Sequence, residues 1–308
     1  MKFTIYHDSR RGGRKSNQDR VAYCYSRDAL LMVVADGMGG HLHGEVAAEI
    51  AVKFITDNFQ RDAAPILDDP YMFLSKALVN AHHAILDYAT DRLNDESPRT
   101  TCVACLIQDG RAYWAHTGDS RLYLIRAGKV VTQTRDHSRV QLMIEQGLID
   151  EEQAVQHPAR NRIYSCLGGI HLPQIDFSPQ TRLHAGDVLV LCTDGLWTPM
   201  SGVVLAERLS GANLMEAVPP LMDEAERLAG RQADNLSLIA LTWEEGTASN
   251  SSSVISTQTM PIDQFAMRMN GFVGSRYGAG EPAQTDLSEE DIERVVMEIQ
   301  TAIQKHSQ

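Results

Sequence analysis

Apolar residues in the first 243 positions fall into two kinds of run, short continuous runs and longer runs with helical spacing. Short apolar runs bounded by polar turns are typical of strands. Asp109-Gly110 and Ala127-Gly128 have the composition of tight hairpin turns, so we expect mainly antiparallel sheets. The pattern predicts strands over residues 3–8, 21–26, 30–36, 101–108, 111–118, 121–128, 129–134, 187–193 and 236–243.

Three longer segments have the spacing of amphipathic helices. Residues 44–59 repeat apolar side chains four positions apart, for example at Val46 and Ile50. Similar patterns cover residues 70–91 and 214–228. Because strands and helices come in separate blocks, the sequence predicts an α+β fold. In such a fold, helices cover the outer faces of two stacked antiparallel sheets.

A change of composition after Trp243 predicts the end of the globular domain. The next stretch is polar and rich in Ser and Thr, which is typical of a flexible tether. We therefore expect a folded domain over residues 1–245, a flexible linker over 246–285 and an amphipathic helix over 286–308. The apolar stripe of this helix consists of Ile292, Val296, Ile299 and Ile303. Its candidate partners are its own domain, another protein, or a second copy of the chain.

Size, charge and cysteine content narrow the class of protein. The chain has 308 residues, 43% of them hydrophobic, so it can bury a full core. We find no apolar signal core at the N-terminus and no run near the roughly 18 apolar residues of a membrane span, so no membrane partner is expected. Five scattered cysteines favour a reducing compartment, the cytoplasm. The net charge of −12 disfavours nucleic acid as a partner and suits cation sites.

Cys102 and Cys105 are spaced like a chelating or redox pair, but they lie in a predicted strand. Residues three apart in a strand point to opposite faces of the sheet. We therefore expect two buried structural thiols.

Five aspartates stand at or next to the ends of predicted strands. Asp36 and Asp194 close apolar runs, Asp234 precedes the last run, and Asp19 and Asp119 occupy similar positions. An unpaired carboxylate withdrawn from water is costly, and few Lys or Arg residues lie in these runs. Carboxylates, backbone carbonyls and waters are the ligands of hard divalent cations. The aspartates are therefore interpreted as a shared Mg²⁺ or Mn²⁺ cluster. The alternative is that each merely caps a turn.

Arg14 is a candidate phosphate ligand. It follows two glycines and precedes Asp19 by five residues, and its planar guanidinium suits a pair of phosphate oxygens. The alternative is an ordinary exposed arginine, but beside a divalent cluster it indicates phosphoryl chemistry. The glycines after Asp36 lack the spacing and the Lys-Ser/Thr ending of nucleotide-binding loops.

These residues belong to five motifs: R-x-x-N-x-D at residues 14–19, DGMGGHLHGE at 36–45, TGDSR at 117–121, TDGLW at 193–197 and DNLSLI at 234–239. In type and order, the motifs resemble those of the metal-dependent Ser/Thr protein phosphatases, the protein phosphatase 2C family, in its bacterial form. The resemblance covers residues 1–243 and would make the folded domain a phosphatase domain.

The resemblance implies a four-layer α-β-β-α sandwich with a binuclear Mn²⁺ or Mg²⁺ site at one end of the central sheets. By motif, Asp36 would bridge both ions and the carbonyl of Gly37 would bind one of them. Asp194 and Asp234 would hold the other ion.

The remaining motif residues have supporting roles in the family. Asp19 would act through a bound water, Asp119 would help to hold a third and weaker ion, and Arg14 would bind phosphate. The expected catalytic residues are Arg14, Asp36, Asp194 and Asp234. The expected metal ligands are Asp19, Asp36, Gly37, Asp119, Asp194 and Asp234.

Two-metal chemistry then predicts a hydroxide shared by two cations that attacks phosphorus in line, without a phosphoenzyme. Animal members carry a histidine, the proposed general acid, where this chain has Met38. The proton donor stays open between His41 and a metal-bound water. Gln18 stands where many members have glutamate, so one carboxylate is lost and weaker metal binding is expected.

Residues 135–169 correspond to the variable flap beside the active site of this family, and they are rich in Arg and His. Arg139, His157, Arg160 and Arg162 either contact acidic or phosphate groups of a substrate or form a solvated face.

The predicted function is hydrolysis of phosphoserine and phosphothreonine in proteins, opposing a Ser/Thr kinase. Phosphoprotein substrates and that kinase are the expected partners. Two alternatives are a catalytically silent phosphoprotein-binding module of the same fold and a hydrolase of small phosphoesters. Aspartates at all five motifs disfavour the silent module, because a scaffold without activity has no need of several costly carboxylates.

Overall fold

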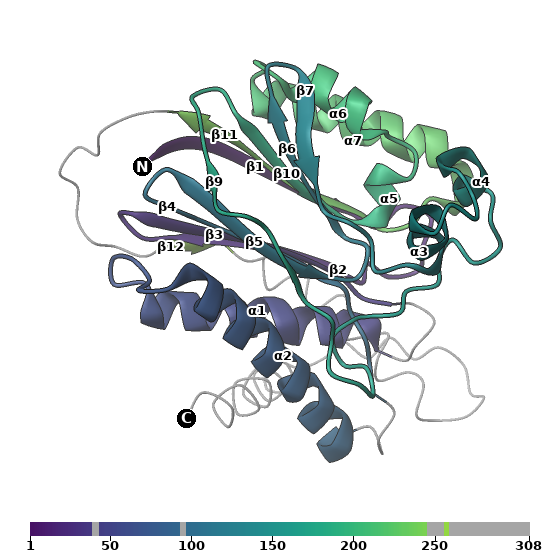
Figure 1. The fold of residues 1–308 in the computed structure, drawn as a ribbon, viewed down its shortest axis with the longest axis horizontal. Coiled ribbons are helices and arrows are strands. Elements are labelled where there is room, and N and C mark those ends of the chain that lie inside the picture. Colours follow the sequence, from purple (N-terminus) through teal and green to yellow (C-terminus); the bar gives the residue numbers. More distant parts are fainter. Residues whose placement is uncertain (39–42, 93–96, 245–255, 259–308) are drawn as a thin grey trace, which may run out of the picture.

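Two stacked antiparallel sheets, each covered on its outer side by helices, make up the described part of the protein. The computed structural model describes residues 1–38, 43–92, 97–244 and 256–258. Figure 1 shows the layers in order, with α1 and α2 below one sheet and α6 and α7 above the other. The four-layer α-β-β-α sandwich predicted above is confirmed.

The first sheet contains the strands from both ends of the folded domain. All its neighbouring strands are antiparallel. Its order is β1 (Lys2–Arg10), β11 (Leu236–Glu244), β10 (Val188–Cys192), β6 (Arg121–Arg126) and β7 (Lys129–Gln133).

The second sheet is built around two hairpins, β2–β3 and β4–β5, whose strands β3 and β4 pair with each other, and all these neighbours are antiparallel. Its order is β12 (Ser256–Gln258), β2 (Asp19–Tyr25), β3 (Ala29–Asp36), β4 (Cys102–Gln108), β5 (Arg111–Thr117) and β8 (Asp176–Phe177), with β9 (Thr181–Arg182) also paired to β5.

The three predicted long helices are confirmed, each within three residues of its expected ends. They are α1 (Gly44–Asp62), α2 (Pro70–Arg92) and α7 (Leu214–Ala229). The pattern missed short helices, because eight residues or fewer give little periodicity. These are α3 (Arg139–Glu145), α4 (Glu151–Val155), α5 (Asp194–Trp197), α6 (Gly202–Leu209) and the 3-10 turn η1 (Gly230–Gln232).

Strand β3 contributes side chains to two hydrophobic cores, one on each face of its sheet. Its alternate residues Leu31 and Val33 pack against α1 and α2, whereas Leu30 and Met32 pack between the two sheets. A strand buried on both faces therefore needs the continuous apolar run seen in the sequence. Cys102 and Cys105 obey the same rule, since each belongs to a different core, and both are free thiols.

The chain after the folded domain is described only at β12, which lies inside the predicted linker. There, Ser256–Gln258 pairs with Tyr23–Tyr25 at the edge of β2. The rest of the predicted linker and the predicted helix over residues 286–308 lie outside the described residues.

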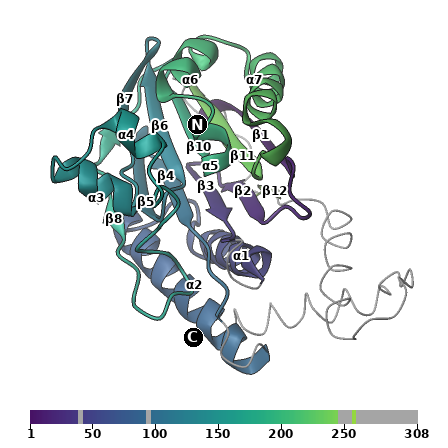
Figure 2. The ribbon, with the colours of Figure 1, turned by 90° about the vertical axis from the view of Figure 1, so that its right-hand side faces the viewer.

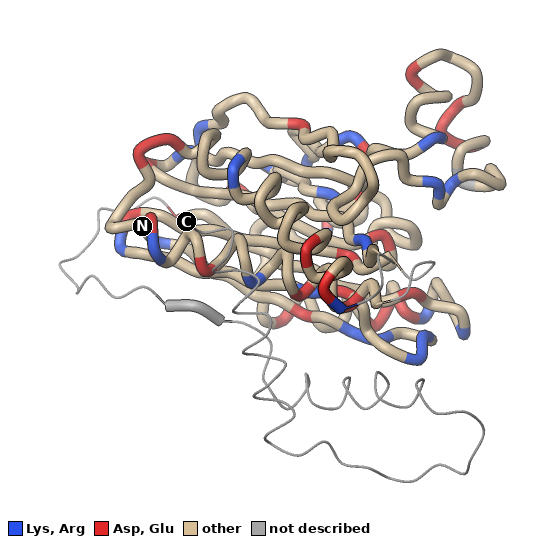
Figure 3. Tube along the Cα trace, turned by 90° about the horizontal axis from the view of Figure 1, so that it is seen from below, with Lys and Arg blue, Asp and Glu red and all other residues tan. Residues whose placement is uncertain are grey.

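Charge is mixed over the described trace. In Figure 3, Lys and Arg positions are interspersed with Asp and Glu positions, and no single basic stripe stands out in that view. None of the described helices combines the length and the apolar character needed to cross a membrane.

Candidate active site

The expected metal ligands lie at strand ends that the topology brings to one end of the sandwich. Asp19 opens β2 and Asp36 closes β3, and the two are direct partners in the antiparallel register. Asp194 follows β10 and Asp234 precedes β11, and these strands are antiparallel neighbours. Asp119 lies in the turn by which the chain passes from β5 to β6, from one sheet to the other. Figure 2 looks onto this end, where α5 lies between the two helical layers.

The electrostatics show that these aspartates share one site. Burial, together with the charges of Asp194 and Asp234, raises the pKa of Asp19 to about 7. Burial and the charge of Asp234 raise the pKa of Asp194 to about 6, although a hydrogen bond with Asp36 acts in the opposite direction. Burial and the other four aspartates hold the pKa of Asp36 well above its ordinary value. Burial and the charges of Asp194 and Asp136 raise the pKa of Asp119, although the charge of Arg121 acts in the opposite direction.

Asp19 shows that this cluster suits a cation. Its Oδ2 accepts a hydrogen bond of 2.9 Å from the hydroxyl of Thr193, but its Oδ1 is buried and has no hydrogen-bond partner. A buried carboxylate oxygen without a donor is costly unless a cation or a cation-bound water faces it. Carboxylates with a backbone carbonyl are also the oxygen set that Mg²⁺ and Mn²⁺ prefer. The residues present therefore fit divalent cations.

Gly37 allows the end of β3 to touch the start of α1. A Cβ atom on Gly37 would lie 2.4 Å from the carbonyl carbon and oxygen of Gly44, so a side chain there would push the helix away. Asp36 beside it is held by Thr101, whose Oγ1 accepts from the Asp36 amide at 3.1 Å and whose amide donates to the Asp36 carbonyl at 2.9 Å. The backbone at Asp36 and Gly37 is thus fixed by contacts that the sequence does not reveal.

Arg14 reaches the same site from the loop between β1 and β2. Its Nη2 lies 2.5 Å from Oδ2 of Asp234; the side chain of Arg14 is exposed, and Asp234 is half-buried. Gln18, at the end of this loop, donates from its side-chain amide to Oε2 of Glu45 at 2.8 Å. Glu45 lies in the first turn of α1, and we had not singled it out from the sequence.

The arginine and tryptophan of two motifs have structural roles. The indole N–H of Trp197 donates to the carbonyl of Asp119 at 2.9 Å. The guanidinium of Arg121 lies 3.6 Å above the centre of the Trp197 ring and makes two hydrogen bonds of 2.8 Å to Asp136. These contacts join the turn that carries Asp119 to the helix that begins at Asp194.

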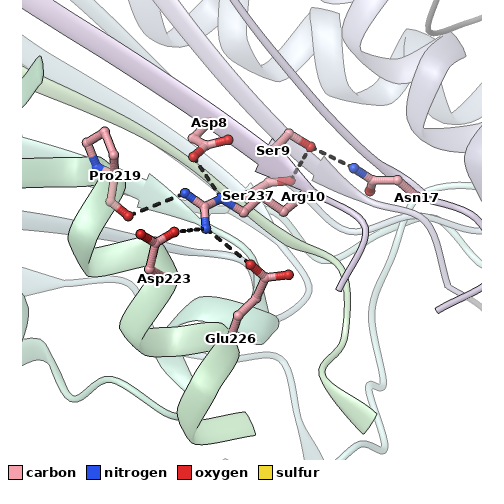
Figure 4. A network of polar contacts seen from close by, with 8 residues as sticks. All are labelled: Asp8, Ser9, Arg10, Asn17, Pro219, Asp223, Glu226 and Ser237. Atoms are coloured by element: carbon pink, nitrogen blue, oxygen red, sulfur yellow. Dashed lines mark hydrogen bonds and ion pairs between the residues drawn. The ribbon is translucent and has the colours of Figure 1, made fainter. Parts of the chain in front are cut away.

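A hydroxyl and amide network lies behind Asp19. Asn17 accepts from the Asp19 amide at 3.0 Å and donates to Oγ of Ser9 at 2.9 Å, and Ser9 is bonded to Ser237 at 2.7 Å. Figure 4 shows Asn17, Ser9 and Ser237 of this network beside Arg10. It links β1, β2 and β11 directly behind the site, so these three strands position Asp19 together.

Arg10 ties the first strand to the outer helix. Its guanidinium bonds to Asp8 at 2.9 Å and, across the layers, to Asp223 at 2.6 Å and Glu226 at 3.1 Å (Figure 4). It also donates to the carbonyl of Pro219 at 3.3 Å. The three contacts with Pro219, Asp223 and Glu226 hold α7 against β1, and Asp8 orients the guanidinium from within β1.

A group that we did not predict, His116, His137 and Asp176, lies next to the turn that carries Asp119. The ligand atoms of these residues lie within 4.8 Å of one another, and both histidines are buried. However, the two imidazole rings are stacked, with centroids 4.8 Å apart and planes 24° apart. An ion lies in the plane of each imidazole that binds it. The planes of two stacked rings do not meet close to the rings, so one ion cannot be bound by both histidines. We therefore assign this group a packing role.

The flap residues are mostly at the surface. Arg139, Arg160 and Arg162 are exposed, and the half-buried His157 accepts from the amide of Ala159 at 3.1 Å. These exposures leave both interpretations of the flap open. Met38 is described, whereas His41, one of the two candidate proton donors, lies outside the described residues.

A sandwich with carboxylates gathered at one end has the features of a metal-dependent phosphatase, and comparison with known proteins agrees. Residues 8–234 match the family described as protein phosphatase 2C. The match covers most of the chain, and the chain therefore belongs to the protein phosphatase 2C family.

Relatives and solved structures support the assignment. The serine/threonine phosphatase Stp of Listeria innocua is 29% identical over 236 residues, which are 76% of this chain and 89% of that protein. The crystal structure of the Mycobacterium tuberculosis serine/threonine phosphatase PstP superposes with a TM-score of 0.69 at 32% identity, over 80% of this chain and 100% of that one. A PstP catalytic domain solved with two manganese ions has a TM-score of 0.67 at 30% identity, covering 79% of this chain and 99% of its own.

Proposed function

We propose that this protein phosphatase hydrolyses phosphoserine and phosphothreonine in proteins and depends on Mn²⁺ or Mg²⁺. The observation that carries the proposal is the gathering of aspartates from five motifs around Asp19, whose buried Oδ1 has no partner in the protein. The relatives support the substrate class, because Stp and PstP are named serine/threonine phosphatases. A PstP structure holds two manganese ions, which supports the choice of metal.

In this proposal, Asp36, the Gly37 carbonyl, Asp194 and Asp234 hold two cations. Asp19 and Asp119 would complete the shell, Asp19 through a bound water and Asp119 by helping to hold a third, weaker ion. Divalent cations bound here would supply an activated water and offset charge on the phosphoryl oxygens.

The aspartates control when the site can be loaded. A carboxylate must lose its proton before it binds a cation. With the pKa of Asp19 near 7 and that of Asp194 near 6, the metal-free site still retains protons at mildly acidic pH. Loading therefore releases protons, and the affinity for the metal should rise as the pH rises through this range.

Arg14 orients the phosphate beside the cluster. It gives one of its five N–H donors to Asp234, and the remaining ones are available to phosphoryl oxygens. Its exposure at the edge of the site allows a phosphorylated side chain of another protein to reach it. Met38 has no ionisable group, so another group must supply the proton for the leaving oxygen.

The partners follow from this activity. Phosphoproteins are the substrates, and a Ser/Thr kinase that phosphorylates the same proteins is the proposed opposing enzyme. An acidic protein is poorly suited to phosphate-rich nucleic acid, which makes phosphopeptides the better test substrates.

The test is turnover of a phosphoserine peptide, a nucleotide and p-nitrophenyl phosphate by the full chain, with Mn²⁺ and with chelator. We expect hydrolysis of the peptide and of p-nitrophenyl phosphate that stops in chelator. Asp36→Ala and Asp194→Ala should each lose more than about 90% of turnover, a barrier increase above about 1.4 kcal/mol.

Asp57→Ala is the matched control, because Asp57 lies on α1 and pairs with Lys53 outside the site. Turnover above a tenth of wild type in either site variant would contradict the cluster. Preference for the nucleotide would contradict the substrate class, and metal-independent turnover would contradict the role of the cations.

A further inference from the structure

The loop of residues 11–18, which carries Arg14, is held on both sides of that arginine by a single side chain, Asn235. The Oδ1 atom of Asn235 accepts from the backbone amide of Gln18 at 2.8 Å. Its Nδ2 donates to the carbonyl of Arg11 at 2.8 Å and to the carbonyl of Ser16 at 2.9 Å. Asn235 therefore hydrogen-bonds to the backbone of this loop both before and after Arg14.

The chemistry of these three contacts specifies an amide. One partner is an N–H group and the other two are carbonyl oxygens, so the side chain must offer one acceptor and two donors. Among short side chains only asparagine offers this set, and reversing its amide would break all three hydrogen bonds. Asn235 is 5% exposed, so water does not readily replace these bonds.

Two glycines let the loop lie directly on the segment before Asn235. Gly12 has a φ of +60°, and a Cβ atom there would lie 2.2 Å from the carbonyl oxygen of Asp234. The amide of Gly13 donates to the carbonyl of Ala233 at 2.9 Å. The backbone of the loop is thus seated on the residues that lead to a proposed metal ligand.

We propose that Asn235 is a positioning residue that holds Arg14 beside Asp234 and so orders the phosphate site before substrate binds. Arg14 itself is exposed and would otherwise move with a surface loop. Ordering the loop in advance removes an entropic cost from phosphate binding. The inference rests on the phosphate-binding role proposed for Arg14, and it assigns to Asn235 an effect that operates through that arginine.

The test compares Asn235→Ala with Arg14→Ala, the double variant and wild type, all as full chains loaded with Mn²⁺. The readouts are KM and kcat for p-nitrophenyl phosphate and the inhibition constant of inorganic phosphate. We expect Asn235→Ala to raise KM and the phosphate inhibition constant roughly tenfold while kcat changes much less. In the Arg14→Ala background, Asn235→Ala should add almost nothing, because it acts through Arg14.

Asn58→Ala is the matched control. Asn58 is as buried as Asn235, but it lies on α1, where its side-chain oxygen accepts a hydrogen bond from Arg61. Hydrogen exchange gives a readout independent of activity, since the amides of Gly13 and Gln18 should exchange faster in Asn235→Ala and not in Asn58→Ala. If Asn235→Ala does not fold, Gly12→Ala should lift the loop from Asp234 and raise the same two constants.

The outcomes separate the two proposals. If Arg14→Ala leaves phosphate inhibition unchanged, Arg14 does not bind phosphate and both ideas about it are wrong. If Arg14→Ala weakens phosphate inhibition but Asn235→Ala does not, only the positioning role falls. Effects of the two substitutions that multiply in the double variant would also overturn the positioning role.

Discussion

Replacing Asp19 by asparagine is expected to stabilise the metal-free protein at high pH. Asp19 is buried, and burial raises its pKa to about 7 from an ordinary value of 3.8. Between these values the folded protein holds a proton that the unfolded chain has lost. The folded state then binds more protons, so stability falls as the pH rises through this window. Asparagine has nearly the same shape and cannot ionise, so it is free of this penalty.

The magnitude follows from the two pKa values. The interval from 3.8 to about 7, at ~1.4 kcal/mol for each factor of ten, corresponds to about 4 kcal/mol. This is an upper value, because Asp194 and the other aspartates titrate together with Asp19 and share the penalty. The hydroxyl of Thr193 keeps an acceptor in the variant, since one side-chain oxygen remains.

The assay is urea unfolding of wild type and Asp19→Asn in chelator, followed by circular dichroism. The stability of the variant relative to wild type should increase by a few kcal/mol between about pH 4.5 and about pH 8. Added Mn²⁺ should favour wild type at the higher pH, because bound metal stabilises the folded state and the variant lacks a carboxylate in the shell. Asp57→Asn, on the surface of α1, serves as the control.

A difference between Asp19→Asn and wild type that stays constant or shrinks as the pH rises would refute this reasoning. It would show that Asp19 ionises in the metal-free protein without penalty. The unpartnered Oδ1 would then be no sign of a cation site.

Two further predictions concern the third cation and the tail. Asp119→Ala should depress turnover and remove one weak Mn²⁺ site in a calorimetric titration while the two tight sites stay filled; an unchanged number of sites would contradict its role. A chain ending at residue 245 should hydrolyse p-nitrophenyl phosphate at close to the full-length rate, because the match to the family ends at residue 234 and β12 adds only three residues at a sheet edge. An insoluble or inactive truncation would place the boundary later.

The sequence alone was sufficient for the class of fold and for much of the site. Strands such as β3 are buried on both faces, so their apolar runs are continuous and easy to detect. The long helices carry a repeating apolar face, which made α1, α2 and α7 predictable. Short helices such as α3 and α5 have too few turns for a period and depend on caps and neighbours. The aspartates stood out because a carboxylate next to an apolar run is costly wherever it lies.

Tertiary structure decided which of these residues meet and what supports them. Asp19 and Asp36 face each other because of strand register, and Asp194 and Asp234 are brought together by two neighbouring strands more than forty residues apart in the sequence. The hydrogen bonds from Asn235 to the loop around Arg14 join residues more than two hundred positions apart in the sequence. Local sequence patterns reveal which side chains are costly to bury and which segments have the period of a helix or a strand. Their partners come from distant segments, and only the packing of the two sheets sets those distances.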